Sequence, residues 1–240
     1  MRRVVGLVGA GATGKVFARN ILAAGHRIRM FDSDPEALRA FHERSNVSIC
    51  KSPAEAAFEA DYVLTCLPDP ESTRRCVEGA TGVLESASKG AVWIDHSTTD
   101  LAILRQSAAA AAQCGVHAVD APVTGGMALL HRNQMCMYVG SDAPEAILDD
   151  LEPLFRLSCS RVVRTGQLGS ATVCKVVSNM LAYANTAAMG EALMLASKSG
   201  IELEKFYHAM RAGAGNSFVW ETEVPLVLVR RRQRRLPGIP

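Results

Sequence analysis

The feature that most constrains this chain is a glycine turn placed between an apolar strand and a helix. Residues 4–8 form a short β-branched run of the kind found in buried strands. A helical pattern then runs to Gly25, and a second apolar strand over 28–31 ends at Asp32. The glycines of the turn have the spacing GxGxxG, at Gly9, Gly11 and Gly14. This order of elements predicts a dinucleotide-binding unit, whereas the glycine spacing alone would fit a merely structural turn.

Each residue of the turn has a physical role in that prediction. Gly9 permits the tight turn, Gly11 lets a pyrophosphate approach the backbone, and Gly14 lets the helix lie close to the strand. The free amides at the start of the helix, at Ala12 and Thr13, are then expected to face the phosphates.

The acid after the second strand bears on which cofactor is bound. Asp32 lies 18 residues after Gly14 and is placed to accept hydrogen bonds from an adenosine ribose. Its carboxylate repels the additional phosphate of NADP, so NAD is the expected cofactor and NADP the less favoured one. Arg27 or Arg29 would weaken this preference if either lay nearby.

Strand and helix patterns alternate through the first two thirds of the chain. Further strands are expected at 62–67, 91–94, 116–121, 135–139 and 161–164. Helices are expected at 35–44, from a Ser-Pro-Ala-Glu start at 52–55, around Val77 and Leu84, and at 102–114 and 143–155. The alternation predicts an α/β Rossmann domain over 1–164, with a doubly wound parallel sheet.

From Gly169 onward the pattern is helical. Residues 170–198 predict one helix of roughly 40 Å, too long for the first domain alone, and a second helix is expected over 202–212. The long helix is therefore expected to connect the Rossmann domain to a smaller helical domain over 165–225, which is followed by a basic tail at 226–240.

Composition excludes several classes of function. The net charge of +2 gives no indication of a nucleic-acid partner. The seven cysteines form no CxxC pair and no metal-ligand spacing with histidine, which is typical of reduced thiols in a cytoplasmic protein that binds no metal. No stretch is long and apolar enough to suggest a membrane segment.

Three segments are candidates for binding and chemistry. Leu67 and Pro68 end the third strand at the cofactor edge of the sheet. Thr124, Gly125 and Gly126 follow the fifth strand, and their amides could hold a substrate carboxylate. The remaining candidates, Lys175 and Asn179, share one face of the long helix.

The lysine is the candidate for proton transfer. Lys175 is flanked by valines at 173, 176 and 177, an apolar setting that lowers the proton affinity of an amine. Such an amine could exchange a proton with a hydroxyl while a hydride moves. Taken singly, the lysine is more often a surface residue and Pro-Val-Thr-Gly-Gly more often a plain loop. His96, at a strand end, is interpreted as incidental.

In combination, these segments resemble the β-hydroxyacid dehydrogenases related to 3-hydroxyisobutyrate dehydrogenase. The resemblance covers about residues 3–225. The matching segments are the turn at 9–14 with Asn20 and 24–26, then 66–68, 94–98, 120–126 and 166–171, followed by Lys175 and Asn179. It implies that Lys175 is the general acid/base and that Asn179 orients the substrate. It also implies that Thr124, Gly125 and Gly126 hold the carboxylate of a small hydroxy acid, and that Leu67, Pro68 and Thr98 line the NAD site.

The resemblance also implies a homo-oligomer formed through the helical domain. Departures from the family pattern are Thr124 in place of serine, Ala171 in place of glycine and Ser178 in place of asparagine. The family usually continues after Pro225 for several helices, so the helical domain is expected to be shortened at its C-terminus. The arginine-rich tail fits either a basic arm or a shifted reading frame or truncated gene, and the second interpretation is favoured.

The expected activity is NAD-dependent oxidation of a β-hydroxy acid to a semialdehyde. Two alternatives remain open at this point. One is an inactive NAD-binding remnant in which Lys175 has no role. The other is an imine, keto-acid or semialdehyde reductase on the same scaffold. The lysine favours a hydroxy acid, since imine-reducing relatives lack it.

Overall fold

The structure, a computed structural model, describes residues 2–234, apart from the side chains of 127, 128 and 230–234. The chain divides into two compact units, the first ending at Val176 and the second beginning at Val177. Helix α8 (Ser170–Lys198) begins in the first unit and continues into the second, as expected for the long connecting helix. The functional division into 1–164 and 165–225 stays a prediction.

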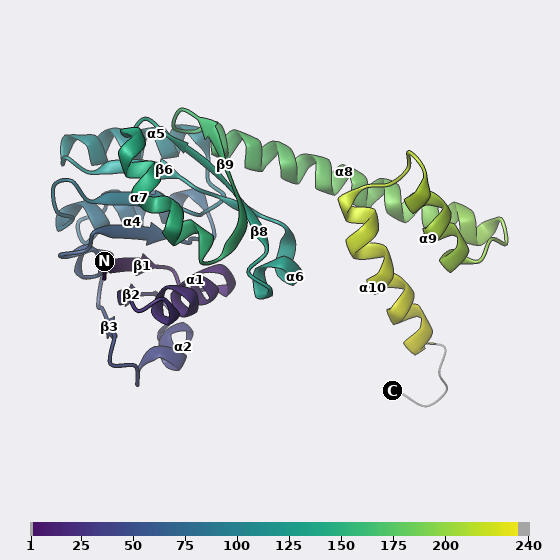
Figure 1. Cartoon of the computed structure of the whole chain (residues 1–240), viewed down its shortest axis with the longest axis horizontal. Coiled ribbons are helices and arrows are strands. Elements are labelled where there is room, and N and C mark those ends of the chain that lie inside the picture. The colour runs from purple at the N-terminus through teal and green to yellow at the C-terminus, as the bar shows by residue number, and fades with distance from the viewer. Residues whose placement is uncertain (1, 235–240) are drawn as a thin grey trace. The chain divides into compact units, whose positions relative to one another are not determined.

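The first unit is built on one sheet (Figure 1). Among the described residues, its nine strands follow the order β3-β2-β1-β4-β5-β6-β8-β7, and β9 pairs with β8. The strands are β1 (Val4–Val8), β2 (Arg27–Phe31), β3 (Val47–Ile49), β4 (Tyr62–Thr65), β5 (Val92–Asp95), β6 (His117–Asp120), β7 (Val123–Thr124), β8 (Met135–Ser141) and β9 (Cys159–Gly166). The predicted Rossmann sheet is confirmed, and the sequence patterns missed the short strands β3 and β7.

The sheet is mostly parallel, as predicted, and one strand departs from this arrangement. β8 runs antiparallel to β6 and β7, while the other pairings are parallel. Only residues 125–134 separate β7 from β8. A parallel crossover requires about a dozen residues or more, so this short connection favours an antiparallel pair.

The helices of the first unit lie between its strands in the chain, and several of them begin at a side-chain cap. They are α1 (Ala12–Ala23), α2 (Pro35–Leu38), η1 (Arg39–Phe41), α3 (Pro53–Ala57), α4 (Pro70–Glu78), η2 (Val83–Glu85), α5 (Leu101–Gln113), α6 (Gly126–His131) and α7 (Glu145–Arg156). The Ser52 hydroxyl accepts from the Glu55 amide at 3.1 Å, as predicted for the start of α3.

Two helix predictions needed correction, and one further helix was not predicted. The helix expected over 35–44 is only α2 with the 3₁₀ turn η1. Val77 belongs to α4 and Leu84 to η2, because α4 ends at Gly79, where the backbone becomes extended. Helix α6 was not predicted from the sequence.

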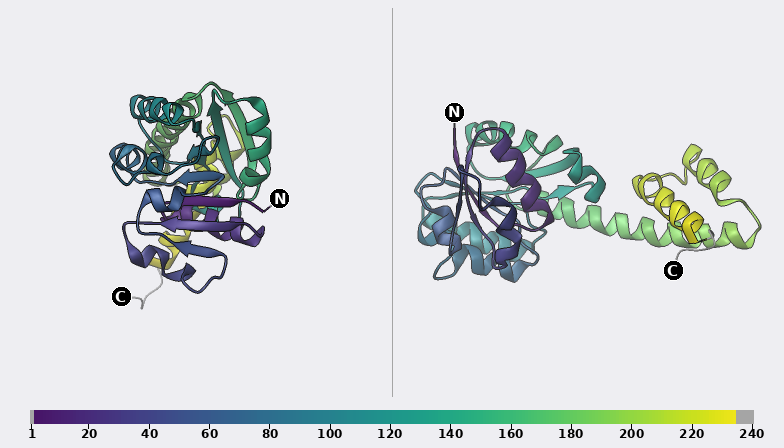
Figure 2. Two further views of the ribbon diagram at one scale, coloured as in Figure 1. Left: turned by 90° about the vertical axis from the view of Figure 1, so that its left-hand side faces the viewer. Right: turned by 90° about the horizontal axis from the view of Figure 1, so that it is seen from below.

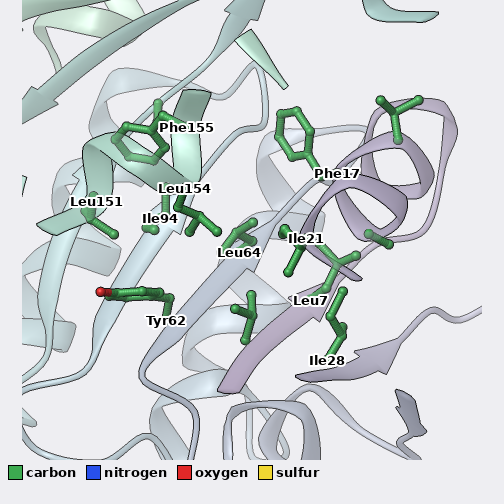
Figure 3. Close-up of a cluster of buried hydrophobic side chains, with 14 of the residues drawn as sticks. Leu7, Phe17, Ile21, Ile28, Tyr62, Leu64, Ile94, Leu151, Leu154 and Phe155 are labelled. Carbon is green, nitrogen blue, oxygen red and sulfur yellow. The ribbon is translucent and has the colours of Figure 1, made fainter. Parts of the chain in front are cut away.

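Alternating strand side chains give the sheet two apolar faces, and helices cover both (Figure 2). On one face, Leu7, Leu64 and Ile94 pack with side chains of α1 and α7 (Figure 3). On the other face, the adjacent strand residues Val8, Val63 and Trp93 pack with α3, α4 and α5. This two-sided burial is characteristic of parallel sheets with crossover helices.

The second unit is helical over 177–234. It contains most of α8 together with α9 (Leu203–Ala212) and α10 (Phe218–Arg234). Its core is a small cluster around Leu193, Trp220 and Val224. The first part of the predicted basic tail continues α10 as far as Arg234, and 235–240 lie outside the described residues. Within the described part of the chain, no helix combines the length and the apolar character needed to cross a membrane.

Candidate active site

A cavity of about 620 Å³ lies at the carboxyl ends of β1, β2, β4 and β5. The described residues that line it all belong to the first unit. The predicted site residues among them are Gly9, Gly11, Ala12, Thr13, Gly14, Asp32, Leu67, Pro68, Thr98 and Lys175. The structure therefore brings the predicted cofactor residues and the candidate lysine to one cavity, where open α/β sheets bind their ligands.

The glycine turn has the close contacts that a phosphate cradle requires. Gly9 has a φ of +98°, and a Cβ atom added there would lie 2.4 Å from the Cys66 carbonyl oxygen. A Cβ at Gly14 would lie 2.0 Å from the Gly9 carbonyl oxygen, so α1 could not approach the turn with any other residue. Gly11 instead faces open space, because a Cβ there would meet no described atom within 4 Å.

The start of α1 suits an anion. Its N-cap is Gly11, a residue without a side chain, so it cannot cap the first-turn amides of the helix. These amides and the positive end of the helix dipole favour a phosphate. The open space at Gly11 and the close packing at Gly9 and Gly14 together fit a dinucleotide pyrophosphate.

Asp32 is held at the cavity wall by two backbone donors. Its Oδ2 accepts from the Ala10 amide at 2.6 Å, and its Oδ1 accepts from the Asp34 amide at 2.8 Å. Each carboxylate oxygen has a further lone pair for a ribose hydroxyl. Both oxygens of the carboxylate are thus held at the cavity wall, and its role in ribose recognition stays a prediction.

The arginine near the cofactor cavity is not one of those expected. Arg27 and Arg29 are absent from the described residues lining the cavity, and the Arg29 Nε donates to the Glu55 carbonyl at 2.9 Å. Arg75, on α4, does line the cavity. Sequence reasoning missed it, because its presence there depends on how α4 packs on the sheet.

A buried hydrogen-bond chain positions the segments that follow β4 and β5. The Leu67 amide donates to the Ser97 hydroxyl at 2.9 Å, and the Ser97 amide donates to Asp95 Oδ1 at 3.0 Å. The Thr65 hydroxyl donates to the same oxygen at 2.9 Å. Ser97 also lines the cavity, although the sequence analysis did not single it out.

Lys175 lines the cavity from the first turns of α8. Burial holds the pKa of its amine below the ordinary value, the direction expected from the sequence. The flanking Val173 and Val176 are themselves 45% and 50% exposed, so their contribution to this shift stays a prediction. The Lys175 side chain is itself half-buried.

The predicted carboxylate loop lies beside the cavity. Val123 lines it, whereas Thr124, Gly125 and Gly126 are not among the described lining residues. Gly125 and Gly126 have φ values of +128° and +74°, which glycine adopts readily. Asn179 belongs to the second unit, and its role stays a prediction.

His96 lines the cavity and is held in place by its neighbours. Its Nδ1 lies 2.7 Å from the Ala121 carbonyl oxygen, and its ring packs edge-on against Phe17 with centroids 4.6 Å apart. Burial lowers the pKa of His96 to about 4. The imidazole is therefore neutral near pH 7, and Nδ1 carries the proton because its partner is a carbonyl.

Comparison with known families assigns both parts of the chain. Residues 4–166 match the NAD binding domain of 6-phosphogluconate dehydrogenase. Residues 169–236 match the family described as NAD-binding of NADP-dependent 3-hydroxyisobutyrate dehydrogenase, so this match includes most of the arginine-rich segment. The chain therefore contains NAD(P)-binding domains, as predicted, although these matches do not separate NAD from NADP.

Individual relatives agree with the family matches. A probable 3-hydroxyisobutyrate dehydrogenase of Mycobacterium bovis is 31% identical over 222 residues, which are 92% of this chain and 74% of the relative. An L-threonate dehydrogenase of Cupriavidus necator is 30% identical over 95% of this chain and 76% of its own length. The solved structure of Mycobacterium tuberculosis 3-hydroxyisobutyrate dehydrogenase with L-serine has a TM-score of 0.84 at 30% identity, covering 99% of this chain and 76% of that one. The chain belongs to the β-hydroxyacid dehydrogenase family, and its predicted class, a 3-hydroxy acid dehydrogenase dependent on NAD(P), is confirmed.

Proposed function

We propose that this protein oxidises a small β-hydroxy acid to a semialdehyde with NAD, using Lys175 as general base. The observation that carries the proposal is that Lys175 lines the same cavity as the glycine turn and Asp32. A base in this position is within the volume that a cofactor and a small substrate would share. When bound, the nicotinamide ring would accept the hydride.

The proton and the hydride leave the substrate separately. The hydroxyl proton moves to the neutral Nζ of Lys175, and the C–H bond electrons leave as hydride while the carbonyl forms. The lowered pKa of Lys175 supports this role, because it increases the fraction of neutral amine near pH 7. In the reverse direction the ammonium returns the proton to the carbonyl oxygen.

The substrate carboxylate is proposed to bind at Thr124, Gly125 and Gly126. The positive φ values of the two glycines support this, since such backbone can turn successive amides toward one anion. Asn179 is proposed to orient the substrate on the basis of the resemblance alone. The homo-oligomer and the cytoplasmic location stay predictions.

NAD is proposed as the preferred cofactor. The Asp32 carboxylate, fixed by the Ala10 and Asp34 amides, would lie against a 2′-phosphate and repel it. Arg75 is the opposing influence at this cavity, because a guanidinium pairs well with a phosphate. Calorimetric titration of the full chain with NAD and then NADP decides between them, and tighter binding of NADP would assign the dominant effect to Arg75.

The catalytic proposal is tested with Lys175→Ala and a panel of β-hydroxy acids. We expect turnover, followed by NADH absorbance, to fall about 100- to 10,000-fold while NAD affinity is unchanged. Lys198→Ala, an exposed lysine in the last turn of the same helix, is the matched control and should change neither quantity.

The same assay separates the alternatives. NAD binding without turnover by the unaltered chain would support the inactive NAD-binding protein. Turnover that is unaffected by Lys175→Ala would exclude the lysine as the base. Reduction of imines or keto acids in preference to oxidation of hydroxy acids would support a reductase on this scaffold.

A further inference from the structure

A buried carboxylate at the end of β6 holds the start of α8. Asp120 is 1% exposed, and its two carboxylate oxygens accept hydrogen bonds from two residues that follow it by 49 and 52 positions. Oδ1 accepts from the Gly169 amide at 2.9 Å. Oδ2 accepts from the Thr172 amide at 2.7 Å and from the Thr172 hydroxyl at 3.0 Å.

Through these contacts, a side chain on a strand distant in the sequence caps the N-terminus of α8. The amides at the beginning of a helix have no partner within it, and Asp120 satisfies two amides at the start of α8. Its negative charge also lies at the positive end of the helix dipole. The fit is close, because a Cβ added at Gly140 would lie 2.5 Å from Asp120 Oδ1 and 2.8 Å from the Ser170 hydroxyl.

The capped turn is the one that leads to Lys175. Lys175 follows Thr172 by three residues, so nearly one helical turn separates the capped amide from the candidate base. Asp120 is also followed directly by the segment that contains Val123 and the proposed carboxylate loop. One side chain thus connects the end of β6 to the helix that carries the lysine.

The neighbouring strand provides a contrast. Asp95 is in register with Asp120 on the paired strand β5 and is equally buried. It bonds to Thr65 and Ser97, near its own strand end, and its Oδ2 has no hydrogen-bond partner in the described part of the chain. Of these two buried carboxylates, Asp120 is the one whose side-chain bonds reach α8.

We propose that Asp120 is a positioning residue that sets the place of Lys175 against the cofactor cavity. The role assigned to Lys175 rests on the proposed function, whereas the mechanical link from Asp120 to the helix does not. A residue that acted on stability alone would leave the environment of Lys175 unchanged in the folded protein.

The first experiment measures the environment of Lys175 without requiring turnover. Asp120→Asn keeps the shape of the side chain but replaces one acceptor oxygen with an amide donor, opposite donors in α8. The rate of Lys175 acylation against pH, followed by mass spectrometry on the full chain, gives the pKa of its amine. We expect this pKa to rise toward the ordinary value as the first turn loosens and the burial of the amine decreases.

The direction of that change distinguishes geometry from charge. Loss of a nearby negative charge would lower the pKa of an amine, whereas loss of burial raises it. A rise in the pKa of Lys175 in folded Asp120→Asn therefore supports positioning. An unchanged or lowered pKa in the folded variant overturns the proposal.

Two further variants keep the test decisive. Asp100→Asn alters an exposed aspartate that caps α5 through the Ala102 and Ile103 amides, and it should leave Lys175 unaffected. Thr172→Val removes one of the three donors to Asp120 and should shift the pKa in the same direction by less. If Asp120→Asn does not fold, Thr172→Val decides, and no shift in that variant overturns the proposal.

Turnover gives an independent measure in the active protein. We expect Asp120→Asn to lower kcat on the order of 10- to 100-fold with NAD affinity unchanged, as for a misplaced catalytic group. In a Lys175→Ala background the same substitution should cause no further loss, because its effect acts through the lysine. Full turnover by Lys175→Ala would refute the proposed function, while the acylation experiment would still test the positioning.

Discussion

The two units of this chain keep their apolar side chains from water to very different extents. In the first unit, the sheet buries Leu7, Trp93 and Ile94 completely, and helices cover both of its faces. In the second unit, the core is a small cluster around Trp220, while Tyr183 on α8 is 75% exposed. The difference indicates that the first unit carries its own stability and that the second depends on a few contacts.

The cause is architectural. A parallel sheet joined by crossover helices is covered on both faces, so nearly every strand side chain is buried. A few helices without a sheet leave much of their surface uncovered, and a small unit buries a smaller fraction of its surface. The second unit accordingly exposes large apolar residues, with Leu195 at 68% and Phe218 at 56%.

The largest effect is expected from removal of the central side chain of the second unit. Trp220 packs against Phe206 and Tyr207, and its Nε1 donates to the Tyr207 carbonyl at 3.2 Å. We expect Trp220→Ala to cost about 3–5 kcal/mol, enough to unfold the second unit alone. Helical circular dichroism should fall, while Trp93, the remaining tryptophan, should keep its native fluorescence.

The control is a large side chain on the same helix. Phe218→Ala, at a site 56% exposed, should change stability by no more than about 0.5 kcal/mol. If Trp220→Ala also unfolds the environment of Trp93, the two units are one cooperative structure and the contrast between them is incorrect.

A smaller change in stability is expected when a glycine is replaced by alanine, and its sign should differ between the two units. Gly14→Ala places a Cβ 2.0 Å from the Gly9 carbonyl oxygen and should destabilise the first unit by about 1–3 kcal/mol. It should also weaken NAD binding, because the turn has to shift. Thermal unfolding and calorimetric titration measure the two effects.

Gly190→Ala is the matched substitution in the second unit. Gly190 lies inside α8, and a Cβ there meets no described atom within 4 Å. We expect stabilisation of about 0.5–1 kcal/mol from the higher helix propensity of alanine. If Gly190→Ala instead destabilises the protein, the space beside Gly190 is not open, contrary to the structure.

The smallest effect is an acid sensitivity that belongs to the first unit. The pKa of His96, lowered by burial to about 4, lies below its unfolded value of about 6.5. As pH falls between these values, the unfolded chain binds a proton that the folded chain does not, so stability decreases. We expect a loss of about 1 kcal/mol between about pH 7 and about pH 5.5 from this group.

The contribution of His96 to the pH dependence of stability is obtained by comparing His96→Gln with the unaltered chain. Buried Asp95 and Asp120 have raised pKa values, which act in the opposite direction at lower pH, so the unaltered chain gives only a sum. Denaturant unfolding, followed by Trp93 fluorescence in a Trp220→Phe background, should show a flatter pH dependence for His96→Gln. His42→Gln, at an exposed site, should retain the original slope.

Sequence alone determined the parts of the fold that local patterns specify. The unit β1–α1–β2, the glycine turn and the acid at its end follow from periodicity and spacing, and the structure places them at one cavity as expected. The helix at 170–198 was also correctly bounded, because a long helical period without proline has one interpretation. Family resemblance then predicted Lys175 at the same cavity.

Only the tertiary structure decided how distant segments meet. Three features depend on packing between residues far apart in sequence. They are the antiparallel course of β8, the presence of Arg75 at the cavity and the hydrogen bond from the start of α8 to Asp120. Local patterns record which face of an element is apolar, but they do not record which partner covers it. The sequence therefore predicted the cofactor cradle, whereas the placement of the candidate base was decided by a carboxylate 55 residues earlier in the chain, Asp120 before Lys175.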